Sequence, residues 1–208
     1  MKFVGIILLL LTSIFLIACS ANQASNKISN SELENLASKY GGVYIFNQKF
    51  VEEIEKREKE RSDYMDDFFK NNKRNFKRDD LAIMDKKLPQ ILSNGKKYYT
   101  RWIDYENQTG KKAKIPEAYV NKIIEFMGDE NYNKSPNLPI LVMFYVDNND
   151  EIIPIKLSMS YTYYRTKYGL FGDEGHGVRF KDEEQIFIRG GNKFILINGK
   201  FERVSKDK

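Results

Sequence analysis

Cysteine, histidine and tryptophan each occur at very low frequency in this chain of 208 residues, which contains one of each, Cys19, His176 and Trp102. A single cysteine excludes internal disulfides, thiolate zinc sites and a cysteine nucleophile away from its own position. A metal site needs three or four ligands, and the segment around His176 offers no second histidine or cysteine at ligand spacing. No Gly-x-Ser-x-Gly motif precedes His176 to mark a nucleophilic serine. We therefore expect no metal and no cofactor in this protein.

Long hydrophobic runs are also scarce, and the one that exists covers residues 3–18, directly after the positively charged Lys2. A membrane-spanning helix needs roughly 20 apolar residues, so this run is short. A positive start, a short apolar segment and small residues at its end are typical of a secretory signal peptide. The alternative is an uncleaved anchor helix, which is disfavoured because the only cysteine stands at the end of the run.

The run ends in Leu16-Ile17-Ala18-Cys19, which resembles the lipobox of bacterial lipoproteins. This resemblance implies a diacylglyceryl group on the Cys19 thiol, cleavage before Cys19 and acylation of the freed amine. Two or more acyl chains anchor a protein stably, whereas one chain holds it weakly. The resemblance therefore implies a lipid-anchored protein of the bacterial cell envelope. The resemblance further implies that serine at position 20 directs the protein to the outer membrane in a bacterium with two membranes. In a bacterium with one membrane, the same signal implies the outer face of that membrane.

These observations divide the chain into three segments. Residues 1–18 form the cleaved signal peptide, residues 19–31 form the lipidated cysteine with a flexible polar tether, and residues 32–208 form one domain. Cleavage removes Lys2, which lowers the formal net charge by one unit from +5 to +4. This mild charge on an exported protein argues against nucleic acid as a partner.

Within the domain, periodicity and turn residues predict helices first and strands last. We expect a single α+β domain in which the N-terminal helices pack on one face of a mainly antiparallel, curved sheet. This element order resembles that of cystatin-like rolls. The expected helices cover residues 31–39, 48–76, 79–92 and 116–128, and the expected strands cover residues 43–46, 97–105, 138–146, 151–164, 185–189, 193–197 and 200–204.

Several local features refine this prediction. The strand over residues 138–146 is apolar on both faces, which predicts a central strand that is covered on both sides. Pro154 indicates either an edge strand or a bulge. Residues 169–177 are rich in glycine and are expected to form a loop. The last three strands are expected to form a meander, with Asn198-Gly199 as a type I′ turn because that turn needs positive φ at both positions.

The long helix has polarised charges. Its start mixes acidic and basic residues, whereas residues 68–78 contain five basic residues and no acidic one: Lys70, Lys73, Arg74, Lys77 and Arg78. One interpretation is a patch for an anionic partner. The other is that basic residues at the end of a helix complement its dipole. We favour the second interpretation at this stage.

Tyrosine is the one residue type that is unusually frequent, with 13 in the chain. Tyrosine and tryptophan combine a large apolar area with a polar tip and are enriched at binding surfaces. They also suit any half-exposed strand, so a purely structural role is the competing interpretation. The candidate binding residues are Tyr161, Tyr163 and Tyr164 in one segment and Tyr98 and Trp102 in another.

His176 stands beside Asp173 and Glu174, and a histidine flanked by carboxylates is able to act as a general base. Together with Glu183, these residues suggest a hydrolase that acts on the cell wall or on glycans, which is the second hypothesis. The leading hypothesis is a non-enzymatic envelope lipoprotein that binds a protein or glycan partner. Convergence of His176 and two carboxylates in a cleft would favour the enzyme.

Overall fold

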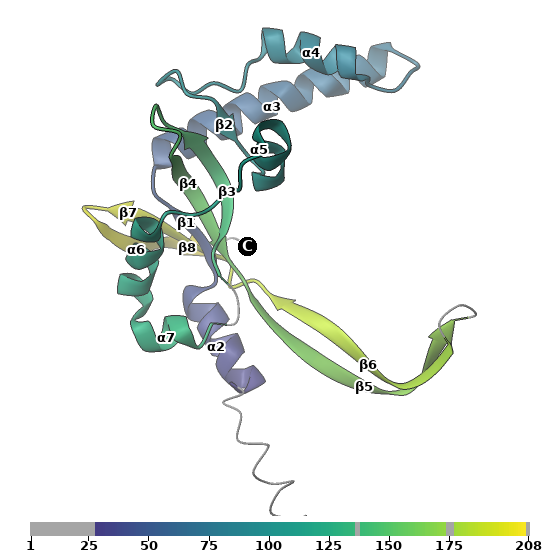
Figure 1. Ribbon diagram of the computed structural model, residues 1–208, viewed down its shortest axis with the longest axis vertical. Coiled ribbons are helices and arrows are strands. Elements are labelled where there is room, and N and C mark those ends of the chain that lie inside the picture. Colours follow the sequence, from purple (N-terminus) through teal and green to yellow (C-terminus); the bar gives the residue numbers. More distant parts are fainter. Residues whose placement is uncertain (1–27, 136–137, 174–176, 207–208) are drawn as a thin grey trace, which may run out of the picture.

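The computed structural model describes residues 28–135, 138–173 and 177–206 (Figure 1). The helices are α2 (Asn30–Tyr40), α3 (Gln48–Asn71), α4 (Arg78–Lys87), α5 (Trp102–Thr109), α6 (Glu117–Met127) and α7 (Asp129–Asn133). The strands are β1 (Gly42–Ile45), β2 (Tyr98–Tyr99), β3 (Ile140–Val146), β4 (Ile152–Met159), β5 (Tyr161–Asp173), β6 (Gly177–Ile188), β7 (Asn192–Ile197) and β8 (Lys200–Lys206). The predicted α+β class, with helices packed on a mostly antiparallel sheet, is confirmed.

The main sheet has the strand order β2-β3-β4-β1-β7-β8, and β5 and β6 form a separate two-stranded sheet. All neighbours in the main sheet are antiparallel except β1 and β7, which run parallel. The predicted meander is therefore wrong in its first strand, because β6 pairs with β5 instead of β7. The β7–β8 hairpin is confirmed, with φ of 50° at Asn198 and 83° at Gly199, as a type I′ turn requires.

Pro154 was expected to indicate either an edge strand or a bulge, and the structure shows a bulge in β4. The strand lies between β3 and β1, so Pro154 is not on an edge strand. Pro154 pairs with Phe144 and Lys156 pairs with Met143, which leaves Ile155 without its own partner on β3. The bulge turns Ile155 and Lys156 toward the same side, where Ile155 packs in the core beneath α3 and Lys156 lies 3.6 Å from Glu55 of that helix.

Helices cover both faces of the main sheet, which corrects the prediction that they pack on one face. Tyr44 and Ile45 are neighbours on β1 and therefore point to opposite sides. Tyr44 belongs to a hydrophobic cluster with residues of α2, α5 and α6, whereas Ile45 belongs to a cluster with Val51 and Ile54 of α3. The prediction that residues 138–146 are covered on both sides is confirmed, because β3 contributes residues to both clusters.

Residues 97–105 were expected to form one strand, but only Tyr98 and Tyr99 do so, and α5 begins three residues later. The aromatic residues of this segment suit a strand by composition, yet Tyr105 lies at helical spacing from Trp102 and is buried in the core. Gly110 ends α5 in the left-handed conformation with φ of 70°. Helical burial of Tyr105 thus outweighs strand propensity here.

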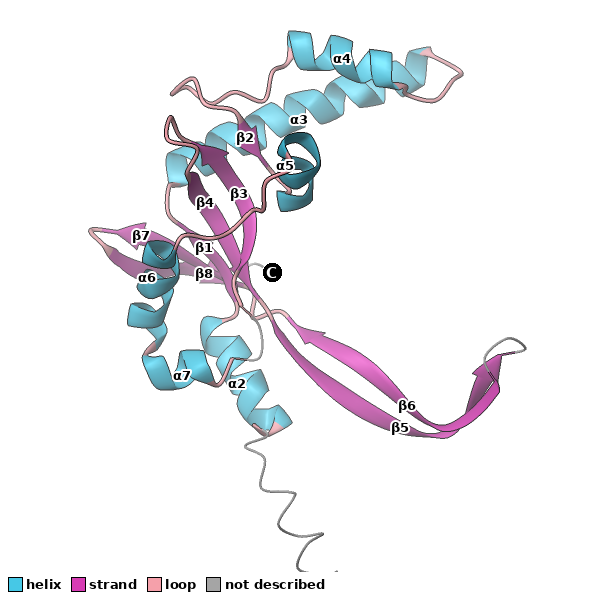
Figure 2. Ribbon diagram, in the orientation of Figure 1, coloured by secondary structure: helices cyan, strands magenta, loops and turns pink. Residues whose placement is uncertain are grey.

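The α3–α4 hairpin projects from the sheet at one end of the molecule (Figures 1 and 2). Arg61 of α3 is only 6% exposed, because its guanidinium donates to the Leu88 carbonyl and pairs with Asp85 of α4 at 2.7 Å. The helix α3 ends at Asn71, earlier than expected, and α4 ends before Pro89. This ion pair and the hydrogen bond to Leu88 thus help to hold the hairpin together outside the two core clusters, where Met84 of α4 is also buried.

The hairpin of β5 and β6 projects from the body in a second direction, and we call these two strands, residues 161–173 and 177–188, the arm (Figures 1 and 2). Gly169 and Gly172 lie within β5, so the expected glycine-rich loop is instead mostly strand. A bulge between Tyr168 and Phe171 interrupts the register. The carbonyl of Gly177 approaches the Gly172 backbone so closely that no side chain fits there. These glycines therefore serve a bent hairpin, not a loop.

Candidate functional site

The five aromatic residues predicted to form a binding surface do not lie together. Tyr98 is fully buried beneath α3, where its hydroxyl donates to Glu58 Oε1 at 2.8 Å. Burial raises the pKa of Tyr98, and the hydrogen bond to Glu58 raises it further. This ring fixes the segment before α5 to the long helix. Tyr98 is therefore a core residue and is withdrawn from the predicted surface.

Tyr161 and Tyr163 share one face at the base of the arm, as the strand spacing predicted, but this face is turned inward. Tyr161 is fully buried in the larger hydrophobic cluster, and burial raises its pKa. Tyr163 is partly buried against the same cluster and pairs with Ile186 of β6. This pair joins the arm to the body and is corrected from a surface pair to a core pair.

Tyr164 and Trp102 are the two predicted residues that do lie on the surface. Tyr164 is 64% exposed on the opposite face of β5, and Trp102 is 43% exposed at the start of α5. Tyr164 belongs to the arm, whereas α5 packs against the body beside β2 and β3 (Figure 1). Only Tyr164 thus belongs to a larger exposed apolar surface.

Two residues of the predicted catalytic group, Glu174 and His176, lie outside the described residues. Asp173 ends β5, and Glu183 lies on β6 with its carboxylate 2.7 Å from the Lys181 ammonium. Within the described parts of the chain, no group of three or more histidine, cysteine or acidic side chains is placed to hold a metal ion. The enzyme hypothesis therefore remains a prediction.

The arm carries the largest concentration of exposed apolar side chains on the described surface. Five of them were not among the predicted site residues: Leu170 lies in the expected loop, Phe187 lies in an expected strand, and Tyr168, Val178 and Phe180 lie in segments for which no strand was expected. The exposed fractions are 64% for Tyr164, 83% for Tyr168, 76% for Leu170, 67% for Val178, 72% for Phe180 and 62% for Phe187. The spacing of Val178 and Phe180, two residues apart, was the available sequence signal for a strand with an apolar face.

Charged side chains accompany these rings along the arm. Glu184 of β6 accepts from Arg165 at 2.8 Å and lies 2.9 Å from Lys167, both across the hairpin on β5. These hydrogen bonds hold the pKa of Glu184 below its ordinary value. Exposed ion pairs of this kind contribute little to stability, because solvent screens the charges. The charged side chains thus lie along the arm without covering its apolar side chains.

Each strand of the arm also has a free edge. In the described part of the chain, β5 and β6 pair only with each other, so neither strand has a partner strand along its outer edge. A two-stranded hairpin is only marginally stable alone. At its base, the exposed ring of Phe187 lines a groove of about 650 Å³ together with Ile140, Val43 and Ser158 of the main sheet.

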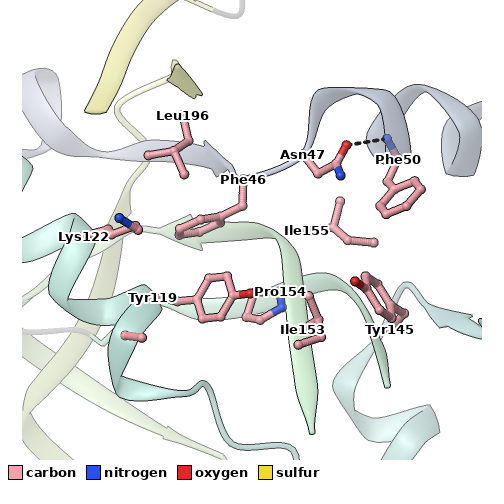
Figure 3. Close-up of a pocket in the computed structure, with 11 residues that line it drawn as sticks. Phe46, Asn47, Phe50, Tyr119, Lys122, Tyr145, Ile153, Pro154, Ile155 and Leu196 are labelled. Atoms are coloured by element: carbon pink, nitrogen blue, oxygen red, sulfur yellow. Dashed lines mark hydrogen bonds between the residues drawn. The ribbon is translucent and has the colours of Figure 1, made fainter. Parts of the chain in front are cut away.

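A second concave feature lies at the other end of β4 (Figure 3). This pocket of about 380 Å³ is mainly apolar, with Phe46, Phe50 and Leu196 among its lining residues. The Asn47 side chain accepts a hydrogen bond from the Phe50 amide at 3.1 Å and so caps α3 at the pocket edge. None of the predicted site residues lines this pocket, and Lys122 is the charged residue of its lining. The buried polar atoms that lack a hydrogen-bond partner in the described part of the chain lie outside the lining.

The comparisons with known proteins give no relative. No family model matches the chain, and no curated protein or solved structure matches it either. The likeness to cystatin-like rolls therefore stays a prediction. Cys19 lies outside the described residues, so lipidation and envelope location also stay predictions. Among the described helices, none has the length and apolar character needed to span a bilayer.

Proposed function

We propose that this protein is a non-enzymatic, lipid-anchored protein of the bacterial cell envelope that binds a partner protein through the arm. The observation that carries the proposal is the set of six large apolar side chains exposed by 62–83% on β5 and β6. Soluble proteins rarely expose apolar side chains together in this way unless the surface has a partner. The proposed anchor at Cys19 would hold the body at the membrane while the arm reaches away from it.

The free edges of the arm suggest how the partner is recognised. An extended segment of another protein adds to a free strand edge through backbone hydrogen bonds, and alternate side chains give the specificity. On the arm, Tyr164 and Phe187 stand on one face near the base, while Arg165 and Glu184 stand on the other. A partner strand beside β5 or β6 would therefore meet an aromatic face and a charged face at once.

Burial of the exposed aromatic rings of the arm against the partner is expected to supply most of the binding free energy. Aromatic anchors at interfaces typically contribute 2 kcal/mol or more each when truncated, as an order of magnitude. Replacing Tyr164, Tyr168 and Phe180 by serine should therefore dissociate the complex without unfolding the body, because none of the three contributes to either core cluster. The matched control replaces Ile83, Ile91 and Val204, which are exposed by 49%, 41% and 56% outside the arm.

The experiment compares the native chain and the two triple variants after mild detergent extraction of the envelope. The native chain and the control should migrate in a complex larger than the monomer, and the arm variant should migrate as the monomer. Co-purification of two differently tagged copies separates a partner protein from self-association. A complex that survives in the arm variant, or one that contains only this chain, contradicts the proposal.

His176→Ala tests the enzyme hypothesis separately. We expect this variant to keep the complex and the cellular phenotype of the native protein, since the proposal assigns no chemistry to His176. Loss of function in His176→Ala with an intact complex would place the hydrolase hypothesis first.

A further inference from the structure

The tip of the α3–α4 hairpin, residues 69–78, carries the five basic residues that the sequence placed at the end of one long helix. The structure places only Lys70 in the last turn of α3. Lys73 lies in the connection, Lys77 is the N-cap of α4 and Arg78 is its first residue. Cations are unfavourable at a helix N-terminus, because the dipole is positive there. The dipole interpretation that we favoured therefore explains Lys70 and fails for Lys77 and Arg78.

Arg74 has a structural task that sets it apart from the other cations. Its guanidinium donates to both carboxylate oxygens of Asp80, at 2.6 and 2.7 Å, and lies 4.8 Å from the ring centroid of Phe68. Asp80 also accepts from the Lys77 backbone amide at 2.9 Å. Arg74 and Asp80 thus fix the connection between the helices. Lys73, Lys77 and Arg78 form no ion pair within the described residues, and all three are exposed.

An exposed aromatic ring lies beside these cations. Phe69 is 52% exposed, and its ring centroid lies 6.2 Å from that of Phe76, the residue directly before Lys77. A soluble polyanion would contact only the cations and would leave Phe69 exposed. At a bilayer surface, basic residues contact anionic headgroups while aromatic side chains enter the boundary with the acyl region.

We propose that the α3–α4 tip docks on a bilayer surface that contains anionic headgroups. Lys73, Lys77 and Arg78 contact the headgroups, and Phe69 inserts beside them. The tip and the start of α2, to which the proposed tether connects, lie at opposite ends of the molecule (Figure 1). Contact of both ends with one membrane would lay the body along its surface. This docking is independent of the arm and needs no lipid on Cys19.

The test uses a fragment of residues 20–208, which lacks the signal and the cysteine. Every buried residue of the two core clusters lies between Leu33 and Phe201, and Ile28, which packs against the larger cluster, is also present, so the fragment retains the whole described core. Vesicles of phosphatidylcholine alone and of an equimolar mixture with phosphatidylglycerol are sedimented with the fragment. We expect binding to the anionic vesicles only, and weakening of that binding by salt.

Two variants and a control identify the surface. The combined change Lys73→Gln, Lys77→Gln and Arg78→Gln should weaken vesicle binding roughly a hundredfold, since each basic residue near an anionic surface contributes about fivefold. The combined control Lys114→Gln, Lys200→Gln and Arg203→Gln removes the same charge elsewhere and should change binding only slightly. Phe69→Ser should weaken binding to vesicles but not to soluble polyphosphate.

Three outcomes would overturn the proposal. The first is absence of binding to anionic vesicles by a fragment with an intact thermal melt. The second is equal weakening by the tip variant and the control, which would indicate only a general charge effect. The third is equal binding to vesicles and polyphosphate with no effect of Phe69→Ser, which would replace the bilayer by a soluble polyanion as the partner.

Discussion

Asn192 is expected to hold the corner where the arm leaves the body. Its side chain is fully buried, and its amide Nδ2 donates to the Ser38 carbonyl at 3.0 Å and to the Gly41 carbonyl at 2.7 Å. These carbonyls belong to the end of α2 and its connection to β1. Asn192 begins β7, four residues after β6 ends at Ile188. Asn192→Ala should therefore remove the side-chain hydrogen bonds that join α2 and its connection to β1 with β7, the strand that follows the arm.

The cost can be estimated from the two hydrogen bonds. The Gly41 carbonyl keeps the Asn192 backbone N–H at 3.2 Å, so it loses one bond of about 1 kcal/mol. The Ser38 carbonyl loses its side-chain donor, but Ser38 is exposed and water is able to replace that donor, so this loss is also about 1 kcal/mol. Asn192→Ala should thus lower the free energy of unfolding by roughly 2 kcal/mol.

Asn192→Asp gives a sharper test, because it keeps the shape and removes the donor. The new carboxylate would face two carbonyl oxygens in a buried site, and we expect its pKa to be raised in the folded state. The folded state then binds more protons than the unfolded state between the two pKa values. Stability of this variant should therefore fall as pH rises above the ordinary aspartate value of about 4.

The measurement is urea unfolding of the native fragment and both variants, at about pH 5 and about pH 7.5, where an ordinary aspartate is already mainly ionised. Asn121→Asp, at an exposed position of α6, is the control and should change stability by about 0.5 kcal/mol or less. If Asn192→Ala lowered the free energy of unfolding by less than about 0.5 kcal/mol, as expected for the control, the reasoning would be refuted. An Asn192→Asp variant whose pH profile matches that of the native chain would refute it as well.

Three further predictions concern other parts of the chain. Tyr161→Ala should cost about 3–5 kcal/mol because the ring is fully buried, whereas Tyr164→Ala should cost about 0.5 kcal/mol or less, and urea unfolding compares them. The hydrogen bonds from Arg74 lower the pKa of Asp80 to about 2, so their stabilisation is full above the ordinary value near 4 and is lost as pH falls toward 2; Asp80→Asn should abolish this dependence in acid melts. Cys19→Ser should abolish fatty-acid labelling, and a labelled variant would contradict the lipobox assignment.

The main sheet shows what the sequence was able to predict. Alternation and turn residues identified most strands, and Asn198-Gly199 identified a hairpin with its turn type. The pairing of β1 with β7 was not predictable in this way, because those strands lie far apart in the chain and run parallel. Local patterns indicate where a strand is but not which distant strand it joins, and this is why the meander was wrong.

The arm shows a second limit. Gly169 and Gly172 were taken as loop residues, since glycine is a frequent turn residue. In the structure they allow a bulge and a close backbone approach within one long hairpin. An arm that projects from the body lacks the one-sided burial that makes strand alternation recognisable. Its exposed rings were therefore missed, apart from Tyr164.

The same limit applies to the predicted tyrosine surface. Strand spacing established that Tyr161 and Tyr163 share a face and that Tyr164 lies on the other one. It did not establish which face meets the core, because both contain aromatic residues. Packing of Tyr161 against α2 and the main sheet decides the question, and those contacts are long-range.

The most direct test of the central claim is site-specific photo-crosslinking in living cells. A photoreactive amino acid replaces Tyr168 or Phe180 on the arm in separate variants, and Lys114 or Ile83 outside the arm in the controls. The account predicts one discrete adduct with another protein from both arm positions and none from the controls. The absence of any adduct from the arm, or the same adduct from arm and control positions, would contradict the assignment of the arm as the binding element.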